Sequence, residues 1–300
     1  MRDYVVIIPT YNAESTISFC LDALLRVCSS EDILVVDSRS SDATVDIVKG
    51  RQVDCKLIPD VFNHGLTREF ARRCYESRVC VYLTQDAILS NDSSIEKLVE
   101  PLLSGECDIV YGRQLPRRCS GVFERFPRQF SYGDDDQIRS IEDIGEYGVH
   151  TFFCSNSFAA YSQAALDSVG GFPKVLSNED YVVTAMILKF GGKIKYSSSV
   201  SVVHSHPFRS IEEFKRNFDN GFMRRDYQWV SSLVGPAESR GILFVRGLIS
   251  AVREDNFLKI PVAIWVCCVK WAGFRVGFLF GKHLPPWLCR RLSGSAAYWQ

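Results

Sequence analysis

Several features that would indicate a common class of protein are missing from this 300-residue chain. Its formal net charge is +0, from 35 basic and 35 acidic residues, and this balance argues against nucleic-acid binding, which needs a concentrated basic field. Neither GxGxxG nor GxxxxGK(S/T) occurs, so the sequence carries no dinucleotide fingerprint and no P-loop. There is no internal repeat and no low-complexity tract.

The cysteines form no recognisable framework. All 11 are scattered without a CxxC pair or another metal-ligand spacing, and their number is odd. This pattern is typical of reduced thiols in a cytosolic protein rather than of disulfides. No secretory signal is expected, because the N-terminus passes directly into a predicted strand. We therefore expect a cytoplasmic protein.

Long uncharged apolar runs are also rare. Residues 257–280 are apolar and aromatic, but Lys259, Lys270 and Arg275 interrupt them. The longest uncharged run, residues 260–269, is about half of the 20 residues that span a bilayer. Apolar faces, tryptophans and flanking bases are typical of a helix that lies in a membrane interface. The alternative is an ordinary pair of helices that pack on the core.

What the chain does have is a regular alternation of strand and helix signals over its first 115 or so residues. Residues 4–8 and 33–36 are apolar, β-branched runs typical of strands buried on both faces of a parallel sheet. A helix follows each run, with Asn12 as the expected cap of the first. The pattern predicts βαβ units in an open α/β sheet. Further strands are expected at 56–58, 79–83 and 108–111, and helices at 67–76 and 95–103.

The remaining chain is expected to fall into two parts. Residues 116–208 complete an α/β domain of residues 1–208, whose first half is 1–115, and residues 209–300 form a C-terminal helical extension. Between 115 and 148 we expect a solvated excursion with one short helix near 138–144. Beyond it, helices are expected at 163–169, from 178 and at 211–222, and strands at 193–196 and 200–204.

Polar side chains follow three of the predicted strands, where open α/β sheets bind ligands. They are Pro9, Thr10, Tyr11 and Asn12 after the first strand, Asp37 after the second, and Thr84, Gln85 and Asp86 after a later one. An aromatic ring and an acid in these positions could stack on a nucleobase and hydrogen-bond to it. Taken singly, each has a structural alternative, since Asp37 could cap a turn and Tyr11 could pack.

Together these segments resemble the opening of family-2 glycosyltransferases of the GT-A fold. VIIPTYNA (residues 6–13) and VVDSRSSDAT (residues 35–44) carry this resemblance. Further segments narrow it to the bacterial rhamnosyltransferase branch, over roughly residues 4–210. They are NHGLTR (63–68), LTQDA (83–87), SNSFA (155–159), GGF (170–172), NED (178–180) and VHSH (203–206).

The resemblance implies a donor site at the strand ends. Tyr11 would lie on the nucleobase, and Asp37 would accept a hydrogen bond from the imide N–H of uracil or thymine. Arg68 would contact the diphosphate or the base, unless it is a solvated arginine beside Arg72 and Arg73. The other donor-binding residues implied are Pro9, Thr10, Asn12, Thr84, Gln85 and Asn156.

The resemblance also implies a metal site. Asp86 occupies the last position of the family's Asp-x-Asp motif, although Thr84 stands where the first acid is expected. Asp86 and His204 would hold a divalent cation, Mn²⁺ or Mg²⁺, against the donor's phosphates. Pro207 makes continuation of the strand doubtful, so His206 is expected to pack or to contact the acceptor. A buried, hydrogen-bonded His204 without metal is the alternative.

Glu179 and Asp180 are the implied catalytic pair of an inverting transfer. Asp180 would remove the proton from the acceptor hydroxyl. Glu179 would either raise the pKa of Asp180 or anchor the loop. Away from the flanking motifs, two acids at a helix start could simply complement the helix dipole.

The expected function is transfer of L-rhamnose from dTDP-L-rhamnose to a glycan acceptor during O-antigen or capsule synthesis. The acceptor is expected to be linked to a polyprenyl diphosphate, and the enzyme to be peripheral on the cytoplasmic face of the inner membrane. One alternative is another donor, such as a UDP-hexose. Another is an inactive glycosyltransferase-like protein that serves in a membrane assembly.

Overall fold

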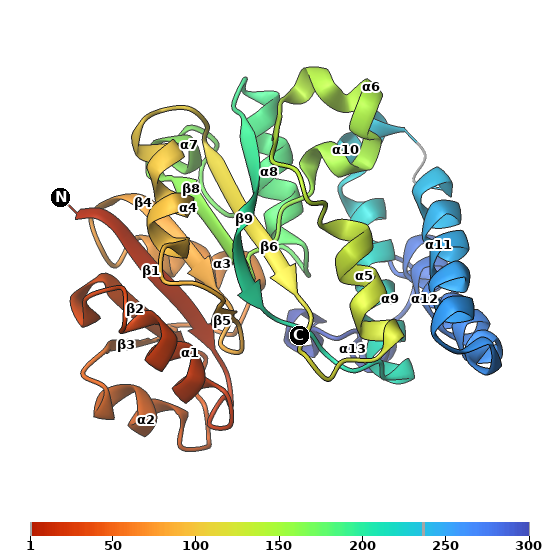
Figure 1. Cartoon of the computed structure of the whole chain (residues 1–300), viewed down its shortest axis with the longest axis horizontal. Helices are drawn as coiled ribbons and strands as arrows, with labels where there is room; N and C mark the ends of the chain where they lie inside the picture. Colours follow the sequence, from red (N-terminus) through yellow and green to blue (C-terminus); the bar gives the residue numbers. More distant parts are fainter. Residues whose placement is uncertain (1, 236–237, 300) are drawn as a thin grey trace.

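Nine strands form one mixed sheet in the computed structural model, which describes residues 2–235 and 238–299 (Figure 1). The strands are β1 (Arg2–Thr10), β2 (Ile33–Asp37), β3 (Asp54–Leu57), β4 (Ser77–Leu83), β5 (Ile88–Leu89), β6 (Ile109–Leu115), β7 (Gln137–Arg139), β8 (Phe158–Ser162) and β9 (Ile194–Val203). Their order is β3-β2-β1-β4-β8-β6-β9-β5, and β7 also pairs with β9.

Helices cover both faces of the sheet and form the end of the chain (Figure 1). They are α1 (Ile17–Leu24), α2 (Thr44–Gly50), α3 (His64–Arg72), α4 (Ser94–Leu103), α5 (Val122–Ser131), α6 (Ile144–Tyr147), α7 (Gln163–Ser168), α8 (Glu179–Lys189), α9 (Ser210–Asp226), α10 (Gln228–Val234), α11 (Glu238–Asn256), α12 (Ile260–Phe280) and α13 (Pro286–Leu292). The expected α/β sheet with C-terminal helices is confirmed.

Parallel pairing sets the place of the site. Strands β3, β2, β1 and β4 are parallel, so their carboxyl ends lie at one edge of the sheet. Thr10 at the end of β1 lies opposite Asp37 at the end of β2. The loops that follow these strands therefore meet, as the rule for open α/β sheets requires.

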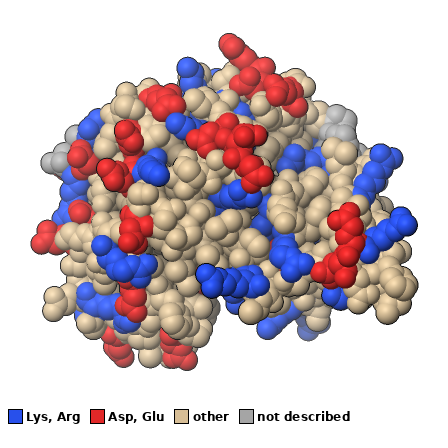
Figure 2. Space-filling model, viewed as in Figure 1, with Lys and Arg blue, Asp and Glu red and all other residues tan. Residues whose placement is uncertain are grey.

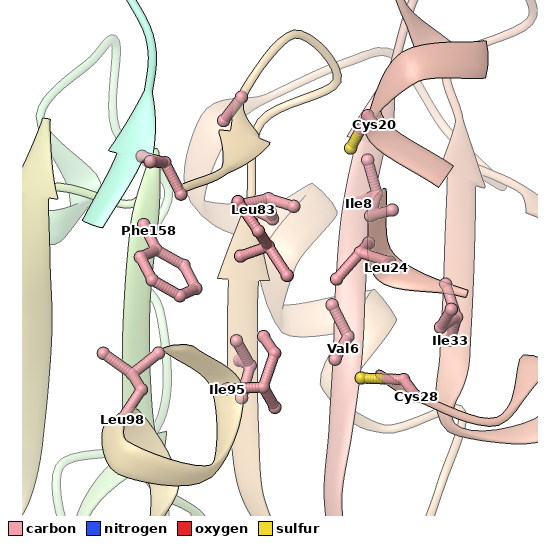
Figure 3. Packing of buried hydrophobic residues seen from close by; sticks show 14 of the residues in the cluster. Val6, Ile8, Cys20, Leu24, Cys28, Ile33, Leu83, Ile95, Leu98 and Phe158 are labelled. Carbon is pink, nitrogen blue, oxygen red and sulfur yellow. The ribbon is translucent and has the colours of Figure 1, made fainter. Parts of the chain in front are cut away.

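Alternation along the strands divides the apolar side chains between two cores. Val6 and Ile8 of β1 are fully buried beneath α1 and α4, while their neighbours on the strand point to the core beneath α3, α7 and α8. Figure 3 shows the first core, where Leu24 of α1 lies by Val6 and Ile8 of β1, and Leu98 of α4 lies beside Phe158 of β8. Burial on both faces explains why these strands are continuous apolar runs.

Residues 116–148 are more ordered than the sequence predicts. The short helix expected near 138–144 corresponds to α6 and the 3₁₀ turn before it, but α5 and β7 were not expected. α5 buries Val122 against Leu248 and Val252 of α11, more than 100 residues away in the sequence. Such a distant contact leaves no local periodicity to detect, so the expectation of a largely irregular segment is wrong.

Two local expectations are also wrong. Asn12 does not cap the first helix, which begins at Ile17 with Thr16 before it. Instead Asn12 has a left-handed backbone, with φ 46°, and its side chain accepts a hydrogen bond from the backbone N–H of Ser41 at 2.9 Å. The strands expected at 193–196 and 200–204 are one strand, β9, whose pairing with β6 shifts register after Gly112.

The C-terminal helices pack closely on one another and return to the sheet. A Cβ atom at Gly277 of α12 would collide with the carbonyl of Phe218 on α9, so glycine permits the close approach of these helices. The chain end lies near the middle of the molecule (Figure 1), where Trp299 packs in a cluster with Leu176. His64 Nε2 lies 3.1 Å from Ser295 Oγ. The division of the chain at residue 208 stays a prediction.

One stretch of the described residues, Arg240–Phe280, has the length and apolar composition of a membrane span. Less than a third of its most apolar part is buried. On α12 the exposed face consists largely of apolar side chains at helical spacing, including Ile264, Trp265, Trp271 and Leu279, with Arg275 among them.

Candidate active site

The first part of the site is built where β1 and β2 end. Asp37 is fully buried, and its carboxylate accepts hydrogen bonds from Thr10 Oγ1 at 3.0 Å, from the Ser40 backbone N–H at 2.7 Å and from Ser40 Oγ at 2.6 Å. Asp37 therefore caps a turn, as the structural alternative had it. A carboxylate has about four acceptor positions, so these three bonds leave one unused.

Tyr11 is held by its backbone and presents its ring to solvent. Tyr11 is 58% exposed, so its ring does not pack in the core. Gln85 fixes the Tyr11 backbone from the loop after β4, accepting from the N–H at 2.8 Å and donating to the carbonyl at 3.3 Å. Pro9 lies within β1 opposite Val36. The expected donor residues Pro9, Thr10, Tyr11, Asn12, Asp37 and Gln85 are thus brought together.

Asp86, His204 and His206 form a compact group beside these loops. Their ligand atoms all lie within 4.8 Å of one another. His204 Nε2 is 3.4 Å from Asp86 Oδ1, His206 Nε2 is 3.3 Å from Asp86 Oδ2, and the two imidazole nitrogens are 3.2 Å apart. His206 was expected to pack or to contact the acceptor, whereas its imidazole lies beside Asp86 and His204, although β9 ends at Val203.

A neighbouring amide orients one of these imidazoles. Gln114 Oε1 lies 3.2 Å from His204 Nδ1, and Gln114 Nε2 donates to Ser155 Oγ at 2.8 Å. The amide oxygen can accept a hydrogen bond from Nδ1–H, and this contact turns His204 Nε2 toward Asp86 and His206. Metal-binding histidines are commonly oriented in this way.

The group has the donor set of a divalent-cation site. Burial favours the neutral form of Asp86, but hydrogen bonding and charge interaction with His204, and then the charge of His206, lower the pKa of Asp86 to about 2. The carboxylate is therefore ionised, and one ring nitrogen of each histidine faces it. The hydroxyl of Thr84, where a second acid was expected, is buried and has no hydrogen-bond partner among the described residues. One carboxylate and two imidazoles fit a divalent cation.

Glu179 and Asp180 begin α8 on the same side of the sheet. Asn156 joins them, because its backbone N–H donates to Asp180 Oδ2 at 3.2 Å and its amide Nδ2 donates to Glu179 Oε1 at 2.9 Å. Tyr161 fixes that amide by donating to Asn156 Oδ1 at 2.9 Å. Asn156 was expected among the donor-binding residues, and the contacts that it makes are with the two carboxylates.

Arg68 is buried and forms an ion pair with Glu179. Its Nη1 lies 3.1 Å from Glu179 Oε1 and donates to the carbonyl of His64 at 3.0 Å. This excludes the solvated alternative for Arg68. Contact of Arg68 with the donor stays a prediction, because Arg68 faces the carboxylate pair.

The adjacent carboxyl groups of Glu179 and Asp180 have pKa values shifted in opposite directions. Burial, and then the charge of Glu179, raise the pKa of Asp180 to about 7. Burial also opposes ionisation of Glu179, but the charges of Arg68 and His64 and the hydrogen bond from Asn156 outweigh it and lower the pKa of Glu179. A pair separated in this way consists of a fixed charge and a group able to exchange a proton near neutral pH. Both expectations for Glu179, raising the pKa and anchoring the loop, agree with these contacts.

Asp180 lies in the wall of a cavity of about 620 Å³. The cavity extends from Asp180 between α5, α9, α10 and the start of α11, and a smaller cavity of about 70 Å³ beside it reaches His206. The first volume is in the range of small-molecule sites. The arrangement provides a base in the wall of the cavity and a cation site beside it.

The sequence analysis missed His206, Gln114 and the arginines of this cavity. The signal for His206 was the shared face of residues two apart on an extended chain, which was set aside because Pro207 made continuation of the strand doubtful. Gln114 and the arginines carried no signal, because neither belongs to a recognisable motif and the helices that carry the arginines meet only in the folded chain.

Comparison with known proteins gives consistent likenesses. Residues 5–170 match the family model described as "Glycosyl transferase family 2". The "O-antigen chain rhamnosyltransferase RfbN" of Salmonella typhimurium is 34% identical, with 98% of this chain and 95% of that protein covered. The "O-antigen chain rhamnosyltransferase WbaN" of Salmonella anatum is 33% identical, with 100% and 96% covered.

Solved structures resemble the chain in fold. The "Mannosyltransferase PcManGT from Pyrobaculum calidifontis in complex with GDP-Man and Mn2+" has a TM-score of 0.64 at 16% identity, over 93% of this chain and 88% of that chain. The structure of "S. aureus TarS 1-349 in complex with UDP-GlcNAc" has a TM-score of 0.53 at 17% identity, over 94% and 92%. At these identities the likeness concerns the fold alone.

Proposed function

The chain belongs to glycosyl transferase family 2 and is a glycosyltransferase, and we propose that it transfers L-rhamnose from dTDP-L-rhamnose to a glycan acceptor in O-antigen synthesis. The choice of sugar rests on the likeness to two O-antigen chain rhamnosyltransferases, which extends over nearly the whole chain. The proposed inverting mechanism rests on Asp180, a carboxyl with a raised pKa in the wall of the cavity.

Asp180 acts as the general base. The acceptor hydroxyl lies in the cavity and gives its proton to the Asp180 carboxylate as its oxygen attacks the anomeric carbon from the side opposite the leaving diphosphate. The product then has inverted configuration. A carboxylate with a pKa near 7 is a stronger base than an ordinary aspartate and is still largely ionised above neutral pH.

Glu179 and Asn156 hold that base in place. Glu179 stays ionised against Arg68 and keeps a negative charge beside Asp180, which raises the proton affinity of Asp180. The backbone N–H groups of Asn156 and Tyr181 donate to the two oxygens of Asp180 at 3.2 and 2.8 Å. These bonds fix the plane of the carboxylate.

The donor's base is bound at the ends of β1 and β2. The exposed ring of Tyr11 stacks on the pyrimidine, and the remaining acceptor position of Asp37 takes the imide N–H. Gln85 holds the Tyr11 backbone and Asn12 ties the two loops together, so the base site is preorganised. Thymine and uracil offer the same imide, so these contacts do not select between them.

Asp86, His204 and His206 would hold the cation, and imidazole ligands favour Mn²⁺ over Mg²⁺. When bound there, a divalent cation neutralises the negative charge of the donor's diphosphate and makes it a better leaving group. Gln114 holds the His204 ring so that Nε2 is turned toward Asp86 and His206, where it would bind the cation in its neutral form.

The acceptor is a glycan linked to a polyprenyl diphosphate, and the enzyme is peripheral on the cytoplasmic face of the inner membrane. The exposed apolar face of α12, with Trp265, Trp271 and Arg275, supports this position. A helix with an apolar outer face and interspersed bases is suited to the membrane interface. The opposite side of α12 packs on α9, so the helix cannot leave the protein without exposing that contact.

A donor panel tests the proposal. The purified enzyme is given Mn²⁺, a lipid-linked glycan acceptor and either dTDP-L-rhamnose or UDP-glucose, and the release of nucleoside diphosphate and the product's anomeric configuration are measured. We expect turnover with the rhamnosyl donor and inversion. Turnover with UDP-glucose alone would overturn the choice of sugar, and an Asp180→Asn variant as active as the unmodified enzyme would overturn the assignment of the base.

A further inference from the structure

The cavity beside Asp180 has an unusual charge balance. Four arginines line it, Arg128, Arg216, Arg224 and Arg240, whereas Asp180 is the one acidic side chain among the described residues of its wall. The sequence as a whole has no such excess, since its acids and bases are equal in number. Figure 2 shows Lys and Arg side chains over α5 and the helices beside it, together with a group of acidic side chains over α11.

Three of these guanidinium groups have no carboxylate partner in the part of the chain that the structure describes. Arg128 faces the carbonyl of His204 at 3.4 Å, Arg224 donates to the carbonyl of Gly235 at 2.8 Å, and Arg240 lies 4.9 Å from the centre of the Phe130 ring. Each of these contacts uses a part of the five N–H donors of an arginine. Donors and positive charge therefore remain available toward the cavity.

Arg216 is the exception, because it pairs with Glu213 at 3.2 Å. Lys270 also contacts Glu213, so that this one carboxylate is shared between two bases. Arg216 and Arg128 line both the larger cavity and the smaller one that reaches His206. The positive charge thus extends from the acceptor cavity toward the cation site.

The helices that carry the unpaired arginines form a packed unit. Arg128 lies on α5, and Arg240 lies near the start of α11. These two helices pack against each other through a cluster that includes Val122 and Leu248. Arg224 lies on α9, which packs along α12. Like charges repel, so the guanidinium groups do not stabilise one another. Apolar packing between the helices keeps them around the cavity.

Nearby groups respond to this positive field. Burial lowers the pKa values of Arg128 and Arg240, since the charged form lacks full solvation. Burial, and then the charges of Arg240 and Arg139, lower the pKa of His150 in the same wall to about 3. A neutral acceptor would gain nothing from such a field, whereas an anion would neutralise it.

We propose that Arg128, Arg224 and Arg240 bind the phosphate groups of a phosphorylated acceptor, while its glycan lies toward Asp180. The inference rests on the proposed function and assigns the acceptor's anionic group to named side chains. Planar guanidinium groups bind phosphate oxygens through paired N–H donors, and several of them together match a diphosphate. Aromatic side chains of the same wall, such as Tyr132 and Tyr227, offer surfaces on which sugar rings can lie.

The first test uses the unmodified enzyme and three acceptors with the same glycan. One carries a short-chain prenyl diphosphate, one a prenyl monophosphate and one a neutral alkyl group of the same length. We expect kcat/KM for the diphosphate to exceed that for the neutral acceptor by roughly ten- to hundred-fold, the range for hydrogen bonds to charged groups. Equal values for the three acceptors would overturn the inference and leave the transfer reaction itself intact.

The second test changes the arginines. In the double variant Arg224→Gln/Arg240→Gln, the ratio of kcat/KM between the diphosphate and neutral acceptors should fall to within about three-fold of unity. The matched control is Arg225→Gln, which removes the same charge from the next residue of α9, outside the cavity wall, and should keep the ratio. A ratio that survives in the double variant would contradict the inference.

The same variants distinguish the acceptor's phosphate from a phospholipid headgroup. If headgroups were the ligand, the double variant would lose binding to vesicles of anionic phospholipid and keep its preference for the diphosphate acceptor, which would overturn the inference. Melting temperatures verify that the variants fold, and the acceptor series on the unmodified enzyme decides the question if they do not. Absence of turnover with any acceptor and either donor would instead count against the proposed function.

Discussion

The two sides of the catalytic carboxylates are built on different principles. On the donor side, Asp37 and Tyr11 sit at the ends of parallel strands, and their polar atoms are fixed by hydrogen bonds within the chain. On the acceptor side, the wall is made of helices, and Arg224 and Arg240 turn guanidinium groups toward a cavity without a carboxylate partner among the described residues. One side is complete without its ligand, and the other needs a ligand to balance its charge.

We attribute the difference to the ligands proposed for each side. A nucleotide presents a flat base with one imide, which a ring and a single acceptor position can match if both are rigid. A phosphorylated acceptor presents diffuse negative charge, which is best matched by several guanidinium groups held in place by the packing of their helices. Asp180 lies between them, so its variants test whether both sides serve one reaction.

The largest effect is expected from Asp180→Asn, which keeps the shape of the side chain and removes the base. We expect kcat to fall by roughly 10²- to 10⁴-fold, the range for general-base catalysis. In the unmodified enzyme, burial and the charge of Glu179 raise the pKa of Asp180 to about 7. Because the ionised form is the active one, kcat/KM should decline as pH falls below 7, and this decline should be lost in the variant's residual activity.

Asp219→Asn is the matched control for that experiment. Burial also raises the pKa of Asp219, to about 6, but Asp219 lies on α9 and accepts from the backbone N–H of Gly294 at 2.9 Å, away from the cavity wall. Its variant should retain the pH profile. An equal loss in both variants would mean that buried charge, rather than proton transfer, explains the result.

The second largest effect is a loss of folding stability, expected when Arg68 is replaced. Arg68→Met leaves the buried carboxylate of Glu179 without its ion-pair partner, and breaking a buried pair in this way costs about 3–5 kcal/mol of unfolding free energy. Denaturant titration measures the loss. Arg73→Met, in the same helical segment but 66% exposed at its side chain and paired with Glu69, should cost less than about 1 kcal/mol. Similar losses for the two would contradict the buried ion pair.

The sequence predicts the residues of the donor side better than those of the acceptor side. Strand periodicity places Asp37 at the end of β2 and Asp86 after β4, because strand ends and register are local or pairwise properties, whereas Asp180 at the start of α8 was expected from the resemblance alone. The acceptor wall depends on α5 meeting α11, a contact between segments more than 100 residues apart, and no periodicity encodes it. Arg128 and Arg240 were therefore not predictable.

The third prediction concerns Gln114, the residue that orients the His204 imidazole of the metal group. Gln114→Leu removes the acceptor for His204 Nδ1–H, so the imidazole loses its fixed orientation, and Mn²⁺ affinity should fall by roughly 10- to 100-fold. Calorimetric titration of the enzyme with Mn²⁺, without donor, measures it. His206→Ala should reduce affinity at least as much, since it removes a ligand. An unchanged affinity in His206→Ala would restore the view that this residue only packs.

The smallest effect is expected at the outer face of the acceptor side. Trp271 on α12 is 65% exposed, and if this face lies in a membrane interface, Trp271→Ser should weaken binding to anionic vesicles by about 1 kcal/mol, roughly five-fold, with no change in melting temperature. Phe19 on α1 is 63% exposed but lies on the donor side, so Phe19→Ser is the matched control and should bind vesicles as the unmodified protein does. Sedimentation with vesicles measures both. Equal loss in the two variants would indicate general surface adhesion, whereas a loss confined to Trp271 would mean that the acceptor side faces the lipid, where an acceptor's diphosphate can reach the arginines.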